Sequence, residues 1–195
     1  MTEPEVRAVF ESAGALLHGH FLLSSGRHSD TYLQCALVLK DPRLAETLGR
    51  ALAERLRDTA PDVVLAPAVG GILVAHEVAR ALGVCALFTE REAGSMRLRR
   101  GFGLAPEQRA LVVEDVYTTG ASVREVAQVV AAAGARLAGV GCLVFRGESR
   151  PAWAPRFEAL LELQAPSWPP EACPLERPGA AAAVKPGSRD LQPAK

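Results

Sequence analysis

Two hydrophobic patterns alternate along most of this sequence, short apolar runs and longer segments in which apolar residues recur at helical spacing. The apolar runs predict strands at 62–66, 84–88, 110–113 and 136–145, with a further short strand at 160–163. The helical spacing predicts helices that end at Ser12 and before Pro61, and two more at 72–82 and 123–133. Because strands and helices alternate, we predict an α/β fold with a mostly parallel central sheet, helices on both faces and an N-terminal hood.

The two ends of the chain differ from this alternating centre. Thr2 and Glu5 have the spacing of a capping box for the first helix. A turn at 24–27 joins an apolar segment to a second extended segment at 31–39, which predicts a hairpin hood. Prolines break regular structure after 165, and the chain after Gly179 is expected to be mostly irregular. We therefore divide a single domain into a helix and hood at 1–40, an α/β core at 41–165 and a tail at 166–195.

The stretch at 110–122, ALVVEDVYTTGAS, carries the most specific chemistry. Glu114 and Asp115 follow an apolar strand, at the sheet edge where α/β proteins bind ligands. Residues 118–122 are small and add hydroxyls and backbone N–H groups at the start of a helix, which suits a phosphate. The carboxylates suit sugar hydroxyls or a hard cation such as Mg²⁺. The acidic pair alone is also explained by a solvated turn, and the small-residue loop alone by a helix cap. The two together predict a phosphorylated sugar as ligand.

Three other segments are candidates for the same edge. Gly70 and Gly71 stand at a strand-to-helix junction, where the backbone approaches a ligand closely, although a plain turn has the same composition. Residues 89–100 are basic and too polar for the core, so they form either a solvated loop or a mobile lid over a phosphate-rich substrate. Arg146 places a cation after the strand at 136–145, a position at which a lone arginine is usually a surface residue.

Overall composition excludes several classes of protein. The 195 residues contain 22 Lys and Arg and 22 Asp and Glu, a balance that argues against a general nucleic-acid or membrane-surface role. The first residues lack the apolar centre of a signal peptide, and no run of 18 apolar residues occurs. We therefore expect a soluble cytoplasmic protein.

The cysteines and histidines give no sign of a metal centre. The chain has four widely spaced cysteines, Cys35, Cys85, Cys142 and Cys173. They lack CxxC spacing and are predicted to be small buried hydrophobes rather than zinc ligands. His18 and His20 are the only close histidine pair, and we expect them to have no thiol or carboxylate beside them.

The strand, acidic pair and small-residue loop together resemble the phosphoribosyl-diphosphate (PRPP) motif of the type I phosphoribosyltransferases. The resemblance implies that Glu114 and Asp115 hold the ribose hydroxyls and act in catalysis, and that 118–122 hold the 5′-phosphate. PRPP binding is implied for the whole motif, residues Glu114, Asp115, Val116, Tyr117, Thr118, Thr119, Gly120, Ala121 and Ser122. Gly70 and Gly71 occupy the family's pyrophosphate loop, where some members carry lysine. The implied cofactor is Mg²⁺, held mainly through PRPP and not by a confident set of protein ligands.

The segment at 21–32 resembles the N-terminal signature of one branch of this family, the orotate phosphoribosyltransferases, in which the hood covers the pyrimidine. The resemblance implies that PRPP and orotate give orotidine 5′-monophosphate and pyrophosphate, in de novo pyrimidine (UMP) biosynthesis. It implies orotate binding by Thr118, Arg146, Ser25 and Gly26. Arg146 would pair with the substrate carboxylate through its planar guanidinium.

The resemblance also implies a homodimer with a shared lid, because in this family a basic lid reaches into the neighbouring subunit's site. This chain carries only arginines there, Arg91, Arg97, Arg99 and Arg100, and which of them replaces the family's catalytic lysine is left open. Two other functions stay open. One is a purine phosphoribosyltransferase, and the other is a non-catalytic regulator that senses PRPP and binds nucleic acid, which the neutral charge balance disfavours.

Overall fold

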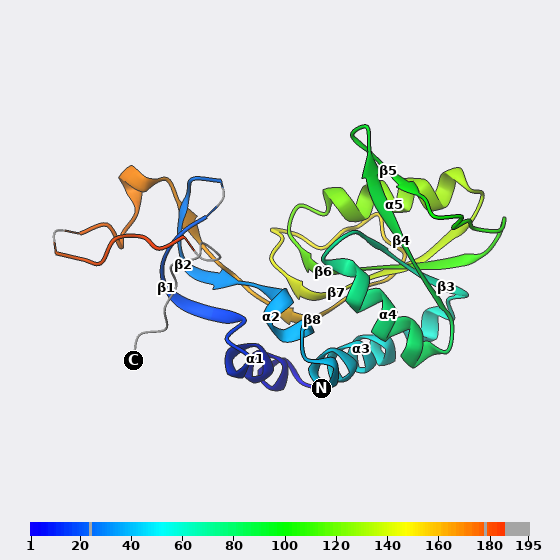
Figure 1. The fold of residues 1–195 in the computed structure, drawn as a ribbon, viewed down its shortest axis with the longest axis horizontal. Coiled ribbons are helices and arrows are strands. Elements are labelled where there is room, and N and C mark those ends of the chain that lie inside the picture. The colour runs from blue at the N-terminus through cyan, green and yellow to red at the C-terminus, as the bar shows by residue number, and fades with distance from the viewer. Residues whose placement is uncertain (24, 178, 186–195) are drawn as a thin grey trace.

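The computed structural model describes residues 1–23, 25–177 and 179–185, and it contains two sheets (Figure 1). The larger sheet has the strand order β5 (Ser95–Leu98), β4 (Cys85–Glu92), β3 (Val63–Pro67), β6 (Arg109–Tyr117), β7 (Arg136–Phe145) and β8 (Phe157–Glu162). All neighbouring strands in it are parallel except β4 and β5. The predicted α/β class with a mostly parallel central sheet is therefore confirmed.

Helices cover both faces of the larger sheet, as predicted. They are α1 (Glu3–Ser12), α3 (Pro42–Leu56), α4 (Gly71–Leu82) and α5 (Ala121–Ala132). Successive strand residues point to opposite faces. On one face Val64 and Ala66 belong to the core that includes α1, α3 and α4, whereas on the other Val63 and Leu65 belong to the core built with α5. At the start of α1 the Thr2 N–H donates to Glu5 Oε2 at 2.7 Å, which confirms the capping box.

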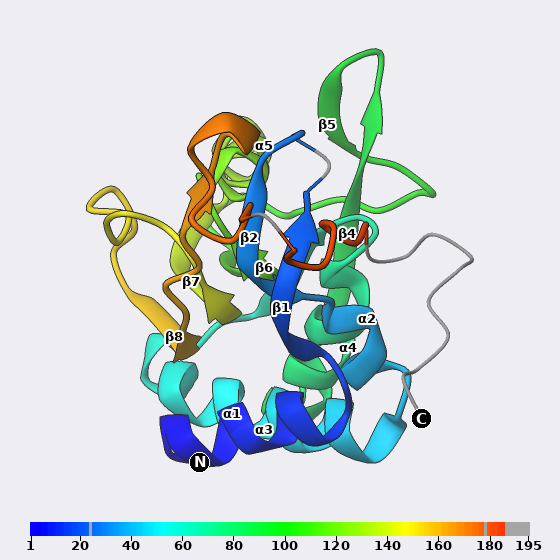
Figure 2. The same cartoon turned by 90° about the vertical axis from the view of Figure 1, so that its left-hand side faces the viewer.

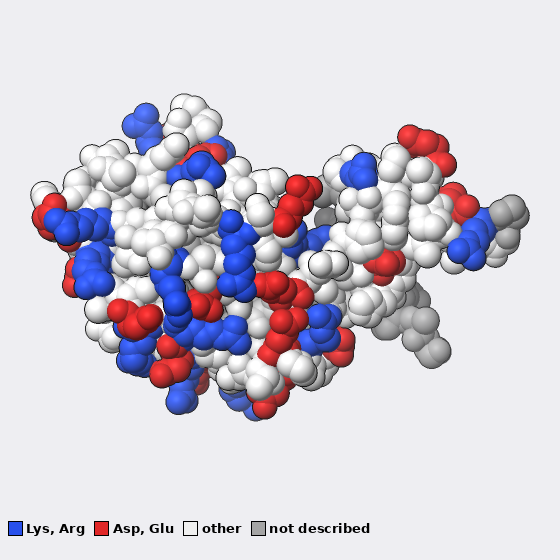
Figure 3. Space-filling model, turned by 180° about the vertical axis from the view of Figure 1, so that it is seen from behind, with Lys and Arg blue, Asp and Glu red and all other residues white. Residues whose placement is uncertain are grey.

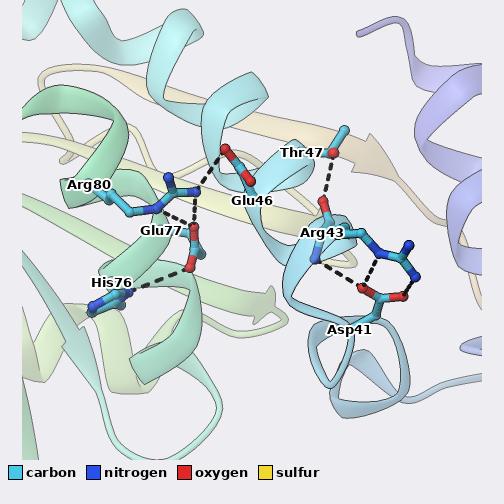
Figure 4. Close-up of polar contacts among 7 residues, drawn as sticks. All are labelled: Asp41, Arg43, Glu46, Thr47, His76, Glu77 and Arg80. Atoms are coloured by element: carbon cyan, nitrogen blue, oxygen red, sulfur yellow. Dashed lines mark hydrogen bonds and ion pairs between the residues drawn. The ribbon is translucent and has the colours of Figure 1, made fainter.

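Close contact between α3 and α4 fixes one side of the core. A Cβ atom at Gly49 would stand only 2.4 Å from Cβ of Glu77, so this position needs glycine for the two helices to approach. At the surface Arg80 of α4 lies 3.2 Å from Glu46 of α3, and 2.6 Å from Glu77 of its own helix (Figure 4). α3 leads toward β3, and α4 begins after β3, so both helices flank a strand that carries the site described below.

The hood is a small antiparallel sheet that faces the viewer in Figure 2, with the strand order β1 (Leu16–Leu22), β2 (His28–Leu33) and β9 (Ser167–Trp168). The predicted hairpin is confirmed, but its second extended segment does not reach Leu39 as predicted. Cys35–Leu39 instead form a short helix, α2. Cys35, Val38 and Leu39 are its buried residues, and this i, i+3, i+4 spacing is helical.

The proline-rich end of the chain is more regular than predicted. Besides β9, residues Pro170–Ala172 form a 3-10 turn. Val184 pairs with β1, since its N–H donates to the His20 carbonyl at 2.9 Å and its carbonyl accepts from Leu22 N–H at 2.8 Å. Prolines interrupt a ladder only at their own N–H, so the residues between them remain able to pair. The remainder of the tail, 186–195, lies outside the described residues.

Candidate active site

The strand order of the larger sheet brings two strand-to-helix loops together. After β3 the chain places β4 on one side of it and β6 on the other, so the loops that follow β3 and β6 open at the same edge. Such a switch point is where α/β proteins bind ligands. Gly70 lies in the first loop, and a Cβ there would stand 2.7 Å from Oδ2 and 2.8 Å from Oδ1 of Asp115. The structure therefore brings the two motifs together as predicted.

The loop after β3 depends on glycine for space. A Cβ at Gly71 would stand 2.8 Å from Cβ of Ala66, and the one at Gly70 would displace the Asp115 carboxylate. The peptide bond between Ala68 and Val69 is cis, and the Val69 side chain is 81% exposed. The backbone of this loop thus lies directly beside the carboxylates.

Glu114 and Asp115 lie within β6 and not after it as predicted. The strand was expected to end at Val113, but it continues to pair with β7 as far as Tyr117, which stands opposite Phe145. Valine and tyrosine favour strands, so the residues after the acidic pair carry the signal that the prediction missed. The carboxylates are therefore held on a rigid element.

Burial raises the pKa of both carboxyl groups. The pKa of Glu114 rises to about 7, mainly through desolvation and further through the charge of Asp115. Burial also raises the pKa of Asp115, although the Val116 N–H partly offsets this by donating to its Oδ1 at 2.9 Å. No basic side chain among the described residues lowers either pKa. The pair therefore favours a ligand that brings positive charge or hydroxyl donors.

The loop at 118–120 turns the chain from β6 into α5. Gly120 has a φ of +72°, in the left-handed region that favours glycine, and a Cβ there would stand 2.0 Å from Oη of Tyr117. Tyr117 is only 4% exposed and packs against Phe145 and Phe157. The buried Tyr117 ring therefore packs under the loop. Any contact between Tyr117 and a ligand on the loop involves the Tyr117 backbone.

The first turn of α5 offers donors to an anion at this edge. Gly120 is the N-cap and has no side chain that could satisfy the N–H groups of the helix. The Ala121 N–H has only a long contact of 3.4 Å to Thr119 Oγ1. Thr118 and Thr119 are exposed and Ser122 is half-buried. Free N–H groups, hydroxyls and the helix dipole make this turn suitable for a phosphate.

Arg146 lies beside the phosphate loop at the end of β7. Its N–H donates to the Tyr117 carbonyl at 2.8 Å, and a Cβ at the next residue, Gly147, would stand 2.8 Å from the Thr118 carbonyl. The guanidinium is half-buried, and burial lowers its pKa. Within the described part of the chain it has neither an ion pair nor a side-chain hydrogen bond. A partly desolvated cation without a partner suits an anionic ligand.

The predicted lid at 89–100 is largely a β-hairpin. We expected β4 to end at Phe88, but it continues to Glu92 and pairs antiparallel with β5. Ala93 and Gly94 both have positive φ, of 47° and 86°, as tight hairpin turns require. In β5 the buried Met96 and the half-buried Leu98 alternate with the exposed Ser95 and Arg97, and this alternation was the missed signal.

The arginines of this hairpin are paired within the chain. Arg91 lies 3.0 Å from Glu125 of α5. Arg97 and Arg99 lie 3.9 and 3.2 Å from Glu92, and Arg100 lies 2.8 Å from Glu90. A catalytic role for Arg91, Arg97 or Arg99 stays a prediction, because each would have to exchange its partner for substrate.

The hood residues predicted to bind orotate lie apart from this edge in the fold. Ser25 and Gly26 are exposed at the turn between β1 and β2, on the smaller sheet. Gly26 has a φ of +78°, and its N–H donates to the Leu23 carbonyl at 2.9 Å. The carboxylates, both loops and Arg146 are thus assembled on one sheet, whereas Ser25 and Gly26 belong to the other.

The expectation that His20 has no thiol or carboxylate beside it is wrong. Its Nε2 lies 3.6 Å from Sγ of Cys173 and 3.4 Å from Oε2 of Glu176. His28 is a further partner of His20, at 2.8 Å between ring nitrogens. Sequence spacing missed this cluster because the hairpin and the C-terminal segment meet only in the fold. Cys35, Cys142 and Cys173 are buried as predicted, but Cys85 is exposed.

The surface outside the candidate site is of mixed charge. Acidic and basic side chains are interspersed on the face seen in Figure 3. A hollow of about 770 Å³ on the α3 and α4 side is lined in part by Arg57 and Arg80, which pair with Glu54 and Glu46. In the residues that the structure describes, no helix has both the length and the hydropathy needed to cross a bilayer.

Comparison with known proteins agrees with this geometry. Residues 37–171 match the family model of the phosphoribosyl transferase domain. The orotate phosphoribosyltransferase of Pelotomaculum thermopropionicum is 53% identical over 191 residues, which cover 98% of this chain and 100% of that protein. The enzyme of the same name from Heliobacterium modesticaldum is also 53% identical, over 97% of this chain and 100% of its own length.

Solved structures give the same result for the fold. The orotate phosphoribosyltransferase of Mycobacterium tuberculosis H37Rv, in complex with Fe(III) dicitrate, aligns with a TM-score of 0.67 and 28% identity, over 82% of this chain and 97% of that one. The adenine phosphoribosyltransferase of Thermoanaerobacter pseudethanolicus aligns with a TM-score of 0.60 and 19% identity, over 68% and 88%. At that identity the second likeness concerns the fold alone.

Proposed function

This chain belongs to the orotate phosphoribosyltransferases of the phosphoribosyl transferase family, and we propose that the edge where β3, β6 and β7 end is its active site. The reaction transfers the ribose 5-phosphate group of PRPP to orotate and gives orotidine 5′-monophosphate and pyrophosphate, in de novo pyrimidine (UMP) biosynthesis. The observation that carries the site is the Asp115 carboxylate, which lies against Gly70 at the switch point of the sheet.

PRPP binds across the two loops that meet there. Its 5′-phosphate is held by the hydroxyls of 118–122 and by the N–H groups at the start of α5, where the helix dipole favours an anion. Its ribose hydroxyls donate to Glu114 and Asp115. Its pyrophosphate lies along the backbone of Gly70 and Gly71, where the absence of side chains leaves room.

The two carboxylates support the chemical step through their charge. The N1–C1′ bond forms as the C1′–oxygen bond to pyrophosphate breaks, the electron pair leaves on that oxygen, and the N1 proton of orotate is released. Positive charge grows on the ribose during this exchange. Glu114 and Asp115 are fixed in β6 in a half-buried position, so their negative charge stabilises the ribose cation more strongly than it would in water.

The donor chemistry of the acidic pair fits Mg²⁺. Both side chains offer hard oxygen ligands, and burial raises their pKa with no basic side chain of the described chain lowering it. Glu114 and Asp115 are the residues that would contact the ion or its water shell, while most of its ligands come from PRPP. When bound, Mg²⁺ neutralises charge on the pyrophosphate that leaves.

Orotate is selected by its carboxylate. Arg146 supplies a half-buried guanidinium directly after β7, and its backbone N–H donates to the Tyr117 carbonyl of the neighbouring strand β6. A planar fork of donors matches a carboxylate, so uracil, which lacks that group, leaves the cation unsatisfied. Thr118 adds a hydrogen bond to the same substrate. Ser25 and Gly26 contact it when the hood closes.

The substrate panel tests this assignment. Orotate, uracil, adenine, hypoxanthine and xanthine are each incubated with PRPP and Mg²⁺, and nucleotide and pyrophosphate are measured. Turnover of orotate alone is expected. Turnover of a purine would show that Arg146 does not select the substrate, and no turnover of any base would leave a PRPP-sensing regulator. We place the reaction in the cytoplasm, because its highly charged substrate does not cross a lipid bilayer unaided.

The lid is proposed to act across a homodimer. Closed two-fold oligomers are common, and the hairpin arginines pair with Glu90, Glu92 and Glu125 and do not contribute to the pKa of Glu114 or Asp115 in their own chain. Subunits that lack the tip of the lid are mixed with subunits carrying Asp115→Asn. Hybrid dimers then contain one complete site and regain activity. Hybrids that form by native mass spectrometry but stay inactive would show that the lid serves its own chain.

A further inference from the structure

Four potential metal ligands converge where the C-terminal segment lies against the hood. His20 of β1 and His28 of β2 face each other across the hairpin, with Nε2 and Nδ1 2.8 Å apart. Oε2 of Glu176 lies 3.4 Å from the first nitrogen and 3.2 Å from the second. Sγ of Cys173 lies 3.6 Å from Nε2 of His20. Figure 2 shows the segment that carries the thiol and the carboxylate crossing the hairpin.

Three of these four separations match the edges of a zinc tetrahedron. Zinc bonds of about 2.0–2.1 Å to nitrogen and oxygen and 2.3 Å to sulfur, at tetrahedral angles, place two N or O ligands about 3.3 Å apart and N and S about 3.6 Å apart. The contacts from His20 to Cys173 and Glu176 have these lengths, as does the contact from His28 to Glu176. The distance between the two histidine nitrogens is shorter, by about half an ångström on the same geometry, and the ligand atoms of His20, His28 and Cys173 all lie within 4.8 Å of one another.

Three of the four side chains are shielded from solvent, whereas the Glu176 side chain is 54% exposed. The side chains of both histidines are only 10% exposed, and Cys173 is 7% exposed. Nδ1 of His20 lies 3.1 Å from the Ala181 carbonyl, so this nitrogen donates and leaves the Nε2 lone pair directed at the cluster. A backbone carbonyl behind a histidine is the usual device that orients a metal ligand.

We propose that His20, His28, Cys173 and Glu176 bind a Zn²⁺ ion that fastens the C-terminal segment to the hood. Two nitrogens, a thiolate and a carboxylate are the donor set of zinc, and four protein ligands make a structural rather than a catalytic site. The ligands come from positions far apart in the sequence, so the ion closes a long loop and stabilises the hood. The proposal does not depend on the reaction assigned above.

Cobalt provides the direct test. The full chain is depleted of metal with a chelator and titrated with Co²⁺, which takes the place of zinc and is coloured. Equimolar Co²⁺ is expected to give the visible bands of a tetrahedral ion and a thiolate charge-transfer band. Zn²⁺ is expected to abolish both bands and to raise the Tm of the depleted protein by about 5 °C or more.

Variants with matched controls identify the ligands. Cys173→Ser is expected to lose the thiolate band, whereas Cys85→Ser, which changes an exposed thiol outside the cluster, retains it. His28→Gln is expected to weaken Co²⁺ binding at least tenfold, and His18→Gln, on the same hairpin, to leave it unchanged. No tetrahedral spectrum with equimolar Co²⁺, or equal loss of the thiolate band in both cysteine variants, would overturn the proposal.

A measurement on the unaltered chain covers the case in which Cys173→Ser does not fold. Alkylation of each cysteine is followed by peptide mass spectrometry with and without Zn²⁺. Zinc is expected to slow the reaction of Cys173 at least tenfold and to leave that of Cys85 unchanged. Equal rates with and without zinc would mean that the four side chains form only a hydrogen-bonded cluster.

Discussion

Replacing Arg146 with methionine separates the orotate site from the phosphate site. Arg146 is half-buried, and its backbone N–H donates to the Tyr117 carbonyl just before the loop that begins at Thr118. A hydrogen bond to a charged group contributes about 1.5–3 kcal/mol. A loss near 2 kcal/mol corresponds to roughly a 30-fold fall in kcat/KM for orotate. The KM for PRPP should change little, because the loop at 118–122 and the carboxylates are untouched.

Stability gives this prediction a second, independent readout. Burial lowers the pKa of Arg146, so folding costs this side chain part of its hydration. Methionine keeps much of its length and removes the charge, and the free energy of unfolding is therefore expected to stay the same or to rise. If Arg146 served only the fold, its replacement would instead lower the free energy of unfolding.

Arg150 offers a matched control on the same segment. It is exposed and pairs with Glu162 of β8. Arg150→Met removes an arginine close to the site in sequence and is expected to leave the KM for orotate unchanged. Initial rates at varied orotate and varied PRPP, with urea unfolding of both variants, complete the assay. If Arg146→Met weakened PRPP and orotate equally, the guanidinium would belong to the phosphate site and the reasoning would fail.

Three further changes test the carboxylates and the loop beside them. Glu114→Gln with Asp115→Asn keeps volume and removes charge, so kcat should fall more than roughly 100-fold with the fold intact, and near-normal turnover would contradict the assignment. The pKa of Glu114 is raised from 4.5 to about 7 in the fold, so between these pH values the folded protein without substrate binds more protons than the unfolded chain. The free energy of unfolding should therefore fall as the pH rises through this window. Urea titrations at about pH 5 and about pH 8 measure this fall, and Glu114→Gln should remove the part that Glu114 contributes. Gly70→Ala places a Cβ 2.7 Å from the Asp115 carboxylate and should lower kcat/KM for PRPP at least tenfold. Gly103→Ala is the control, because its Cβ would stand in open space, and it should leave kcat/KM unchanged. Equal kinetics in the two alanine variants would show that the contact with Asp115 does not matter.

Local patterns predicted most of the core, because strands and helices here carry their own periodicity. The strand at 136–145 and the helix that begins near Gly71 were placed within a residue of their ends. The prediction ended β6 at Val113, because an acidic pair usually marks the end of an apolar run. The strand continues to Tyr117 because these residues pair with β7. Likewise, Cys35–Leu39 read as a strand continuing the hairpin, although its apolar residues have helical spacing.

Contacts between distant segments could not be predicted from spacing. The motif at 110–122 indicates an acidic pair and a phosphate loop, but only the strand order places Gly70 against Asp115. The cluster around His20 is the extreme case, since Cys173 lies 153 positions away in the sequence. No periodic pattern in the sequence indicates such a contact. The pairing of the lid arginines with Glu90, Glu92 and Glu125 was equally hidden, because any of the nearby acidic residues could have served.

The register of β6 and β7 keeps the charges of the proposed active site apart. Tyr117 stands opposite Phe145, so Arg146 is level with Thr118, three residues beyond Asp115. At roughly 3.3 Å per residue their backbones lie about 10 Å apart along the strands. Neither group contributes to the pKa of the other, and burial costs both part of their hydration. The fold therefore holds an anionic and a cationic position that do not neutralise each other. In the proposed site, PRPP with its ribose at one position and orotate with its carboxylate at the other would satisfy both, and the spacing would then place the reacting atoms between two fixed opposite charges.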